Sequence, residues 1–261
     1  LLQQIKLRSR MQPWIDARHN LREKLLPDGR RMSYKSLGDK RRAAALPVFL
    51  DSTGLIDGLL LVVLFDKKLG ALFKLNGKIN TSDQEIKSLA HWPVHVIEKL
   101  LRICHSIAFV LAGLSAERQD VIWITDQDDI VANVDRHGEL VAAFGNILSH
   151  YLDHDLGHIR VATTESDTGK RDLEDFVAIA DIAAGAVCEG LNAYRRVDMS
   201  PVPGLVLPIP AQMSEKARHL MRWFSNKDCK LKRLVLSFEP GSSSEKLRVR
   251  HYDFTALHGV V

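Results

Sequence analysis

Long apolar runs and signal-peptide features are missing from this sequence. The longest uninterrupted apolar stretch, residues 58–65, has fewer than half of the roughly 20 residues that a membrane-spanning helix needs. Lys6 and Arg8 interrupt the first residues, which therefore lack the apolar core of a signal peptide. The sequence thus predicts a protein with no membrane partner. Because the sequence starts at Leu1 rather than Met, we expect it to be a piece of a longer chain.

Cysteine is scarce, with three residues in 261, at Cys104, Cys188 and Cys229. None belongs to a Cys-x-x-Cys pair, and an odd number cannot all pair within one chain. Cys104 and Cys188 fall in apolar stretches with helical spacing, where cysteine usually serves as a small core residue. This pattern argues against a disulfide framework and predicts a reducing, cytoplasmic location.

Glycine-rich phosphate loops are also missing, because no segment matches Gly-x-x-x-x-Gly-Lys-Ser/Thr or Gly-x-Gly-x-x-Gly. The nucleotide-binding loops that carry those signatures are therefore excluded. The composition is that of a folded globular protein, with 46% hydrophobic and 26% charged residues. The net charge of +4 permits a nucleic-acid partner without requiring one.

Apolar segments with strand and helix spacing alternate through the middle of the chain and predict an α/β fold. The segment at 58–66 has the composition of a strand buried on both faces. We expect a main α/β domain over 1–200 and an extension over 201–261, made of a proline-rich connector, a helix and a β-hairpin. The expected strands are 58–66, 71–75, 121–125, 159–162, 231–238 and 246–252, and the expected helices are 1–26, 39–50, 97–111, 140–151, 172–191 and 214–224.

Asp126 closes the predicted strand at 121–125, and Asp128 and Asp129 follow it closely. Ligand sites in α/β sheets lie at the carboxyl ends of strands, and a hard cation such as Mg²⁺ prefers oxygen ligands. Asp126 is therefore a candidate metal ligand, with Asp128 as a helper. The alternative for Asp128 and Asp129 is that they cap the next helix.

A second candidate lies on the predicted helix at 172–191. With 100° per residue, Asp181 falls at the border of the apolar stripe and Glu174 lies on the same side, whereas Asp175 falls on the far, solvated face. Small neighbours around Asp181 would let a ligand approach closely. On helix geometry alone, an ordinary edge residue that makes a surface salt bridge is the better explanation of Asp181.

Several segments together resemble a ribonuclease-H-like family of unknown function. Residues 177–185 are similar to that family's closing helix, which reads roughly Leu-Gln-Leu-Ala-Asp-Leu-Ile-Ala-Gly, although Ala178 stands where the family has Gln. The other resembling segments lie in the family's order within residues 30–195. Residues 34–36, with Arg41 and Arg42 after them, resemble the family's Leu-Lys-Gly-Ser segment and the helix beyond it. Residues 60–68 resemble its strand that ends in Asp-Lys-Lys, and residues 121–126 resemble its strand that ends in Asp.

The resemblance implies a ribonuclease-H-like mixed sheet flanked by helices, and a nuclease that uses Mg²⁺ or Mn²⁺. Asp126 and Asp181 would be the metal ligands, with Asp128 and Glu174 assisting. The family's first strand carries an Asp-Glu-Ser-Gly motif, which we expect upstream of Leu1 or absent. In the alternative assignment, residues 48–51 form the first strand.

A missing first carboxylate favours a second hypothesis, in which an inactive module of the same fold binds nucleic acid or a protein partner. Such modules would suit a defence or mobile-element system, and a homo-oligomer is also compatible with the sequence. Two basic surfaces could contact phosphates or simply be solvated. They are Lys246, Arg248 and Arg250 on the hairpin, and Lys6, Arg8, Arg10, Arg18, Arg22 and Lys24 on the first helix.

Overall fold

The computed structural model describes residues 7–70, 72–75, 78–79, 86–126, 130–131, 134–166, 169–196, 212–226, 228–241 and 247–254. The chain forms two compact units. Unit 1 comprises Leu1–Lys68 and Glu174–Val261, and unit 2 comprises Leu69–Leu173. Both of the segments expected as separate domains, 1–200 and 201–261, contribute to unit 1. The proline-rich connector at 201–211 lies outside the described residues.

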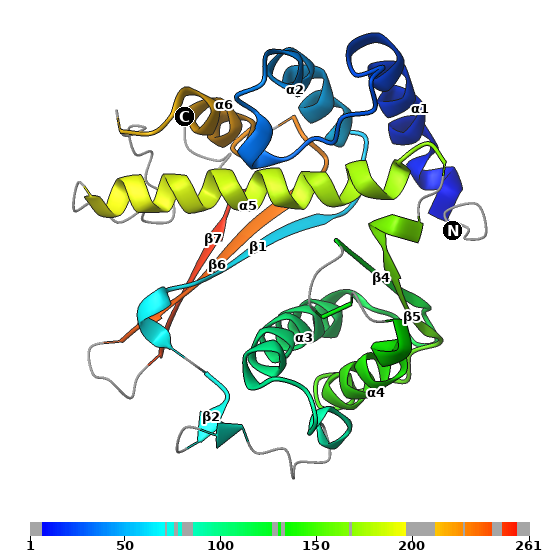
Figure 1. Cartoon of the computed structure of the whole chain (residues 1–261), viewed down its shortest axis with the longest axis vertical. Coiled ribbons are helices and arrows are strands. Elements are labelled where there is room, and N and C mark those ends of the chain that lie inside the picture. The colour runs from blue at the N-terminus through cyan, green and yellow to red at the C-terminus, as the bar shows by residue number, and fades with distance from the viewer. Residues whose placement is uncertain are drawn as a thin grey trace. The chain divides into compact units, whose positions relative to one another are not determined.

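Unit 1 is built from four helices and a three-stranded sheet in its described residues (Figure 1). The strands are β1 (Leu59–Phe65), β6 (Lys232–Pro240) and β7 (Leu247–Asp253), in the order β1-β6-β7. The helices are α1 (Leu7–Leu25), α2 (Lys40–Thr53), α5 (Asp172–Arg196), which begins just before the unit boundary, and α6 (Glu215–Phe224); a short 3₁₀ turn, η2 (Tyr34–Ser36), precedes α2.

The sheet of unit 1 is mixed, as expected, but its strands come from distant parts of the chain. β6 runs parallel to β1 with Leu59 opposite Lys232, and antiparallel to β7 with Leu234 opposite Asp253. The hairpin of β6 and β7 was expected as an addition to the main domain. Instead it supplies two of the three strands of the sheet, and pairing with β6 satisfies the backbone groups along one edge of β1.

One face of this sheet packs into the core of unit 1. Leu60 and Val62 of β1 are buried there with Val235 of β6, and they share the core with residues of α1, α2, α5 and α6, which lie on the same side of the sheet (Figure 1). The other residues of β1 are only partly buried. The expectation that β1 is buried on both faces is therefore wrong, because the structure covers alternate residues as in a one-sided strand.

The helix α5 was expected with the wrong face inward. Ala178, Ile182 and Ala183 are fully buried, whereas Phe176, which the apolar pattern places on the inward face, is exposed. Asp175, expected on the solvated face, is 1% exposed. By length and composition alone α5 could cross a membrane. A criterion based on uninterrupted apolar runs does not detect this helix. Here its apolar stripe belongs to the core of unit 1.

Unit 2 has its own core, between two helices and a pair of parallel strands. α3 (Val94–Leu114) and α4 (His137–Leu148) bury Leu100, Cys104 and Phe144 against each other. β4 (Val121–Thr125) pairs in parallel with β5 (Ile159–Thr163). The remaining elements are short: η3 (Lys67–Leu69), β2 (Lys74–Leu75), β3 (Lys78–Ile79), η4 (Lys87–Leu89), η5 (Val134–Arg136) and η6 (Thr164–Ser166).

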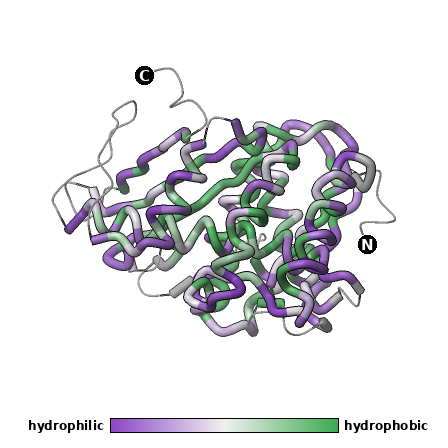
Figure 2. Tube along the Cα trace, turned by 90° about the horizontal axis from the view of Figure 1, so that it is seen from above, coloured by the Kyte–Doolittle hydropathy of each residue, from purple (hydrophilic) through white to green (hydrophobic). Residues whose placement is uncertain are grey.

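The helix and strand positions agree closely with the sequence expectations. β4 has the expected bounds, and α1 ends at Leu25 before the expected stop, where Gly29 adopts a positive φ of 69°. Asp39 caps α2 and Ser214 caps α6 through side-chain hydrogen bonds, as expected for these residue types. Hydrophilic and hydrophobic positions alternate along the helices in Figure 2, which fits helices with one buried face.

Candidate nucleic-acid interface

Asp126 lies where the sequence predicted, directly after β4. Its carboxylate is partly buried, and Oδ1 accepts a hydrogen bond of 3.1 Å from the hydroxyl of Thr164, which follows the parallel neighbour β5. The structure therefore holds an acidic side chain at the carboxyl end of two parallel strands in unit 2. Asp128 and Asp129 lie outside the described residues.

Asp181 is an exposed residue of α5 in unit 1, and it holds a turn in place. Its Oδ2 accepts a hydrogen bond of 2.9 Å from the backbone N–H of Tyr34, the first residue of η2. One turn further along α5, a Cβ on Gly185 would lie 2.2 Å from Cγ of Tyr34. Two segments of the family resemblance, 34–36 and 177–185, therefore touch each other, and their contact explains both Asp181 and Gly185 structurally.

The residues of the expected metal site are divided between the two units. Glu174 and Asp181 belong to unit 1 and Asp126 to unit 2. Among the described side chains, no three His, Cys, Asp or Glu residues lie close enough together to hold a metal ion. Asp126 itself has the oxygen chemistry that Mg²⁺ or Mn²⁺ prefers.

Asp175 is the best-buried acid of α5, and it joins α5 to α1. Nη1 of Arg18 lies 3.0 Å from Oδ2 of Asp175, and Arg22 binds both oxygens of the same carboxylate. Arg18 itself is fully buried. The expectation that Arg18 belongs to an exposed basic face of the first helix is therefore wrong, because Asp175 provides a buried counter-charge for it.

The positive charge of the protein is concentrated in residues 28–42, which we call the basic segment. It contains six lysine or arginine residues and two aspartates, a net charge of +4. The whole chain has 36 basic and 32 acidic residues, so the rest of the chain contains 30 of each sign. The basic members are Arg30, Arg31, Lys35, Lys40, Arg41 and Arg42. The net charge of this stretch equals that of the whole chain. Residues 6–24 have the same net charge, with six basic and two acidic residues, but there Arg18 and Arg22 bind Asp175.

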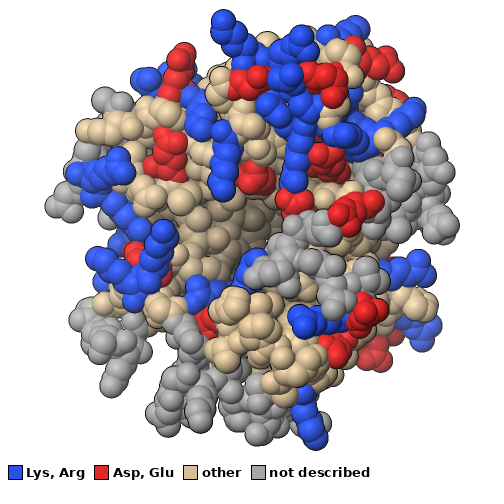
Figure 3. All heavy atoms as spheres, in the orientation of Figure 1, with Lys and Arg blue, Asp and Glu red and all other residues tan. Residues whose placement is uncertain are grey.

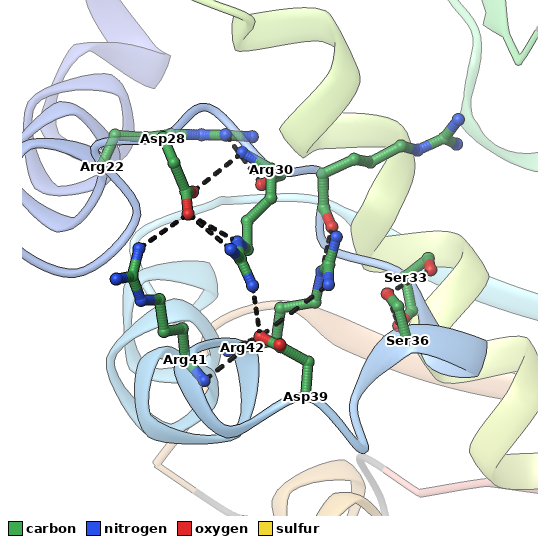
Figure 4. Close-up of polar contacts among 9 residues, drawn as sticks. Arg22, Asp28, Arg30, Ser33, Ser36, Asp39, Arg41 and Arg42 are labelled. Carbon is green, nitrogen blue, oxygen red and sulfur yellow. Dashed lines mark hydrogen bonds and ion pairs between the residues drawn. The ribbon is translucent and has the colours of Figure 1, made fainter.

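Two aspartates hold the arginines of the basic segment in fixed positions (Figure 4). The guanidinium of Arg30 bridges Oδ2 of Asp28, at 2.6 Å, and Oδ1 of Asp39, at 2.8 Å. Arg41 binds Asp28 as well, at 2.8 Å. Nε of Arg42 donates to the carbonyl oxygen of Arg31 at 2.7 Å. The arginine side chains are thus ordered by contacts within the segment before any partner arrives.

The arginine contacts also keep both aspartates ionised. The hydrogen bond from Arg30 lowers the pKa of Asp28 to about 2. For Asp39, the backbone N–H of Arg42 and then the guanidinium of Arg30 lower the pKa. Each aspartate is therefore a fixed negative charge near neutral pH, and the segment keeps its net charge of +4.

The first turn of α2 carries cations where a helix favours anions. Lys40, Arg41 and Arg42 occupy that turn, which contains no acidic residue. The positive end of the helix dipole lies at the N-terminus, so three cations there oppose it. Asp39, as the N-cap, offsets part of this effect by accepting hydrogen bonds from the N–H groups of Arg41 and Arg42. Such a local conflict is common where a surface serves binding rather than stability.

Basic side chains of the segment remain accessible. The side chain of Arg41 is 61% exposed, and those of Arg30 and Arg42 are 29% and 20% exposed. Lys35 and Lys40 are exposed as well. Figure 3 shows Lys and Arg gathered over the top of the view, where Figure 1 places α1 and α2.

The hairpin surface expected from Arg248 and Arg250 is largely neutralised. Glu239 of β6 accepts contacts from Arg250, at 3.1 Å, and from Arg195 of α5, at 2.8 Å. Arg195 also binds Asp66, which follows β1, at 3.2 Å. Burial raises the pKa of Glu239, but hydrogen bonds from Arg195 and Ser237 outweigh it and hold the pKa below its usual value. Lys246 lies outside the described residues.

The basic segment was not identified as a unit from the sequence. Three of its basic residues, Lys35, Arg41 and Arg42, fall in segments that resemble the family. A running count of net charge along the chain would have found it, because the signal is local and needs no knowledge of the fold. By contrast, the burial of Arg18 and Asp175 depends on the packing of α1 against α5, which no local pattern shows.

No family model, curated protein or solved structure matches this chain.

Proposed function

We propose that this protein binds nucleic acid through the basic segment, which contacts backbone phosphates. The single observation that supports this most is the cluster of six basic residues with a net charge of +4 in residues 28–42, where Lys35, Lys40 and Arg41 are exposed. Lysine and arginine contacts to phosphates supply most of the affinity in sequence-independent binding. Arginine suits this role because its planar guanidinium can bind two phosphate oxygens at once.

The arrangement at the first turn of α2 supports the same proposal. Backbone N–H groups at a helix N-terminus favour anions, and here Lys40 and Arg41 add exposed cations beside them. An incoming phosphate would relieve the repulsion between these cations and the helix dipole. These cations thus destabilise the N-terminus of α2 in the free protein, and an anionic partner would offset this effect.

The proposal is tested by removing two of these charges and comparing the salt dependence of binding. We expect the double variant Lys40→Ala/Arg41→Ala to reduce the slope of log affinity against log salt by about 2, measured by anisotropy with a duplex of about 20 base pairs. Folding should be kept, because removing cations from a helix N-terminus favours the helix.

The matched control is Lys67→Ala/Lys68→Ala, which removes the same charge from two exposed side chains of η3, outside the segment. It should leave the slope nearly unchanged. Equal losses in the two double variants would show that charge alone matters and that the basic segment is not the contact site. Absence of binding by the unaltered protein would refute the proposal.

A second candidate function is cleavage of the bound phosphodiester with Mg²⁺ or Mn²⁺. The observation that favours it is the placement of Asp126 at the carboxyl end of β4, beside Thr164. For this function the substitution Asp126→Asn should abolish cleavage in the presence of Mn²⁺ while binding and folding stay intact. Asp181→Asn should do the same if Asp181 is a ligand. Undiminished cleavage by both variants would contradict the assignment.

A further inference from the structure

The basic segment contains a single aromatic side chain, Tyr34, and its ring is engaged on several sides. The hydroxyl donates a hydrogen bond to Oε2 of Glu189. Nζ of Lys216 lies over the ring, 4.2 Å from its centre. Close packing against Gly185 leaves no room for even a methyl group between the ring and α5. Tyr34 therefore has no open face on which a base could stack.

Other aromatic rings do not provide a stacking surface at the segment either. Within the described part of unit 1, Phe176 of α5 is the one aromatic side chain counted as exposed, at 36%. Its ring meets Trp14 edge-on with a separation of 5.7 Å between ring centres. The basic segment thus offers charged groups and hydrogen-bond donors to a ligand, without accessible aromatic faces.

Proteins that bind single strands combine a basic groove with aromatic side chains on which successive bases stack. The basic segment supplies only the first of these two features. A duplex hides its bases and presents one negative charge per roughly 1.7 Å of axis, twice the density of one strand. An array of charged side chains that is ordered by Asp28 and Asp39 matches such a rigid, densely charged surface.

We infer that the basic segment binds the phosphates of double-helical nucleic acid and discriminates against single strands. This inference rests on the proposed function of the same segment and specifies its ligand. Contacts to phosphates carry no sequence information, so we expect the affinity to depend little on base sequence.

The test measures the affinity of the full chain for four labelled ligands of one sequence: duplex DNA, duplex RNA, single-stranded DNA and single-stranded RNA. We expect duplexes to bind at least about tenfold more tightly than single strands of the same length, because they offer more phosphates to the array. Comparison of duplex DNA with duplex RNA shows whether deoxyribose or ribose is preferred. A second duplex of unrelated sequence should bind equally well.

The variant Tyr34→Leu sharpens the test, since it removes the ring and keeps an apolar side chain beside Gly185. It should change neither duplex nor single-strand affinity, provided that circular dichroism shows a folded protein. Single strands that bind as tightly as duplexes, in the unaltered protein, would overturn the inference while leaving nucleic-acid binding in place. A failure to bind any of the four ligands would overturn the proposed function as well.

Discussion

Unit 1 contains three arginine–carboxylate networks that use the same chemistry at three depths. The carboxylate of Asp175 is 1% exposed, that of Glu239 is 18% exposed and that of Asp28 is 30% exposed. Each carboxylate binds two arginines. Burial, rather than the identity of the residues, decides what each network does, because the free energy of an ion pair depends on how far both partners are removed from water.

The buried network joins α1 to α5, and its loss would leave charges without compensation in the core. The exposed network positions arginines at the surface, where water screens their attraction to Asp28. The first therefore contributes to folding, and the second arranges a binding surface at little gain in stability. This difference can be tested by removing one carboxylate charge from each network in turn.

The largest effect is expected for Asp175→Asn. The substitution removes the counter-charge of Arg18, a fully buried side chain, and should lower the free energy of unfolding by about 3–5 kcal/mol. Urea denaturation followed by circular dichroism measures it. A loss below about 1 kcal/mol, the range of surface pairs, would show that burial is not what distinguishes this network.

An intermediate effect that depends on pH is expected for Glu239→Gln. The folded pKa of Glu239 is lowered, so its ionised form stabilises the folded state above the unfolded pKa of about 4.3, and this contribution is lost as the pH falls below it. The unfolding midpoints of the variant and the unaltered protein should differ at pH 7 and converge at low pH. A difference that grows on acidification would contradict this sign.

The smallest effect on stability is expected for Asp28→Asn, which should leave the unfolding midpoint unchanged. Its effect should appear in binding instead, because the variant adds one net positive charge to the basic segment. We expect tighter binding of duplex DNA at low salt, with the gain shrinking as salt screens it. Since the pKa of Asp28 is about 2, the gain should be the same at pH 5 and pH 8. Weaker binding would show that Asp28 helps to hold Arg30 and Arg41 in the competent position.

The sequence predicted those parts of the fold that depend on neighbouring residues. The bounds of β4, the Asp39 cap of α2 and the position of Asp126 at a strand end all follow from local patterns, and the structure confirms them. The pairing of β1 with β6 could not be predicted this way, since about 170 residues separate the two strands.

The orientation of α5 was mistaken for a specific physical reason. Alanines lie among the larger apolar residues of its buried face, and a pattern of large apolar side chains selects Phe176 instead. With that face inward, Asp175 would point to solvent, although it is the acidic residue of α5 that is buried in the structure. For the candidate site, composition along the chain was the informative signal. The geometry of Asp28, Arg30 and Asp39 required the structure.

Lysine footprinting tests the central claim most directly. The full chain is acetylated briefly with and without saturating duplex DNA, and the modification of each lysine is measured by mass spectrometry. Lys35 and Lys40 lie in the basic segment, whereas Lys67 and Lys68 lie outside it, and all four are exposed. The account predicts that DNA protects Lys35 and Lys40 strongly and leaves Lys67 and Lys68 reactive. Protection of Lys67 and Lys68 with continued reactivity of Lys35 and Lys40 would contradict it.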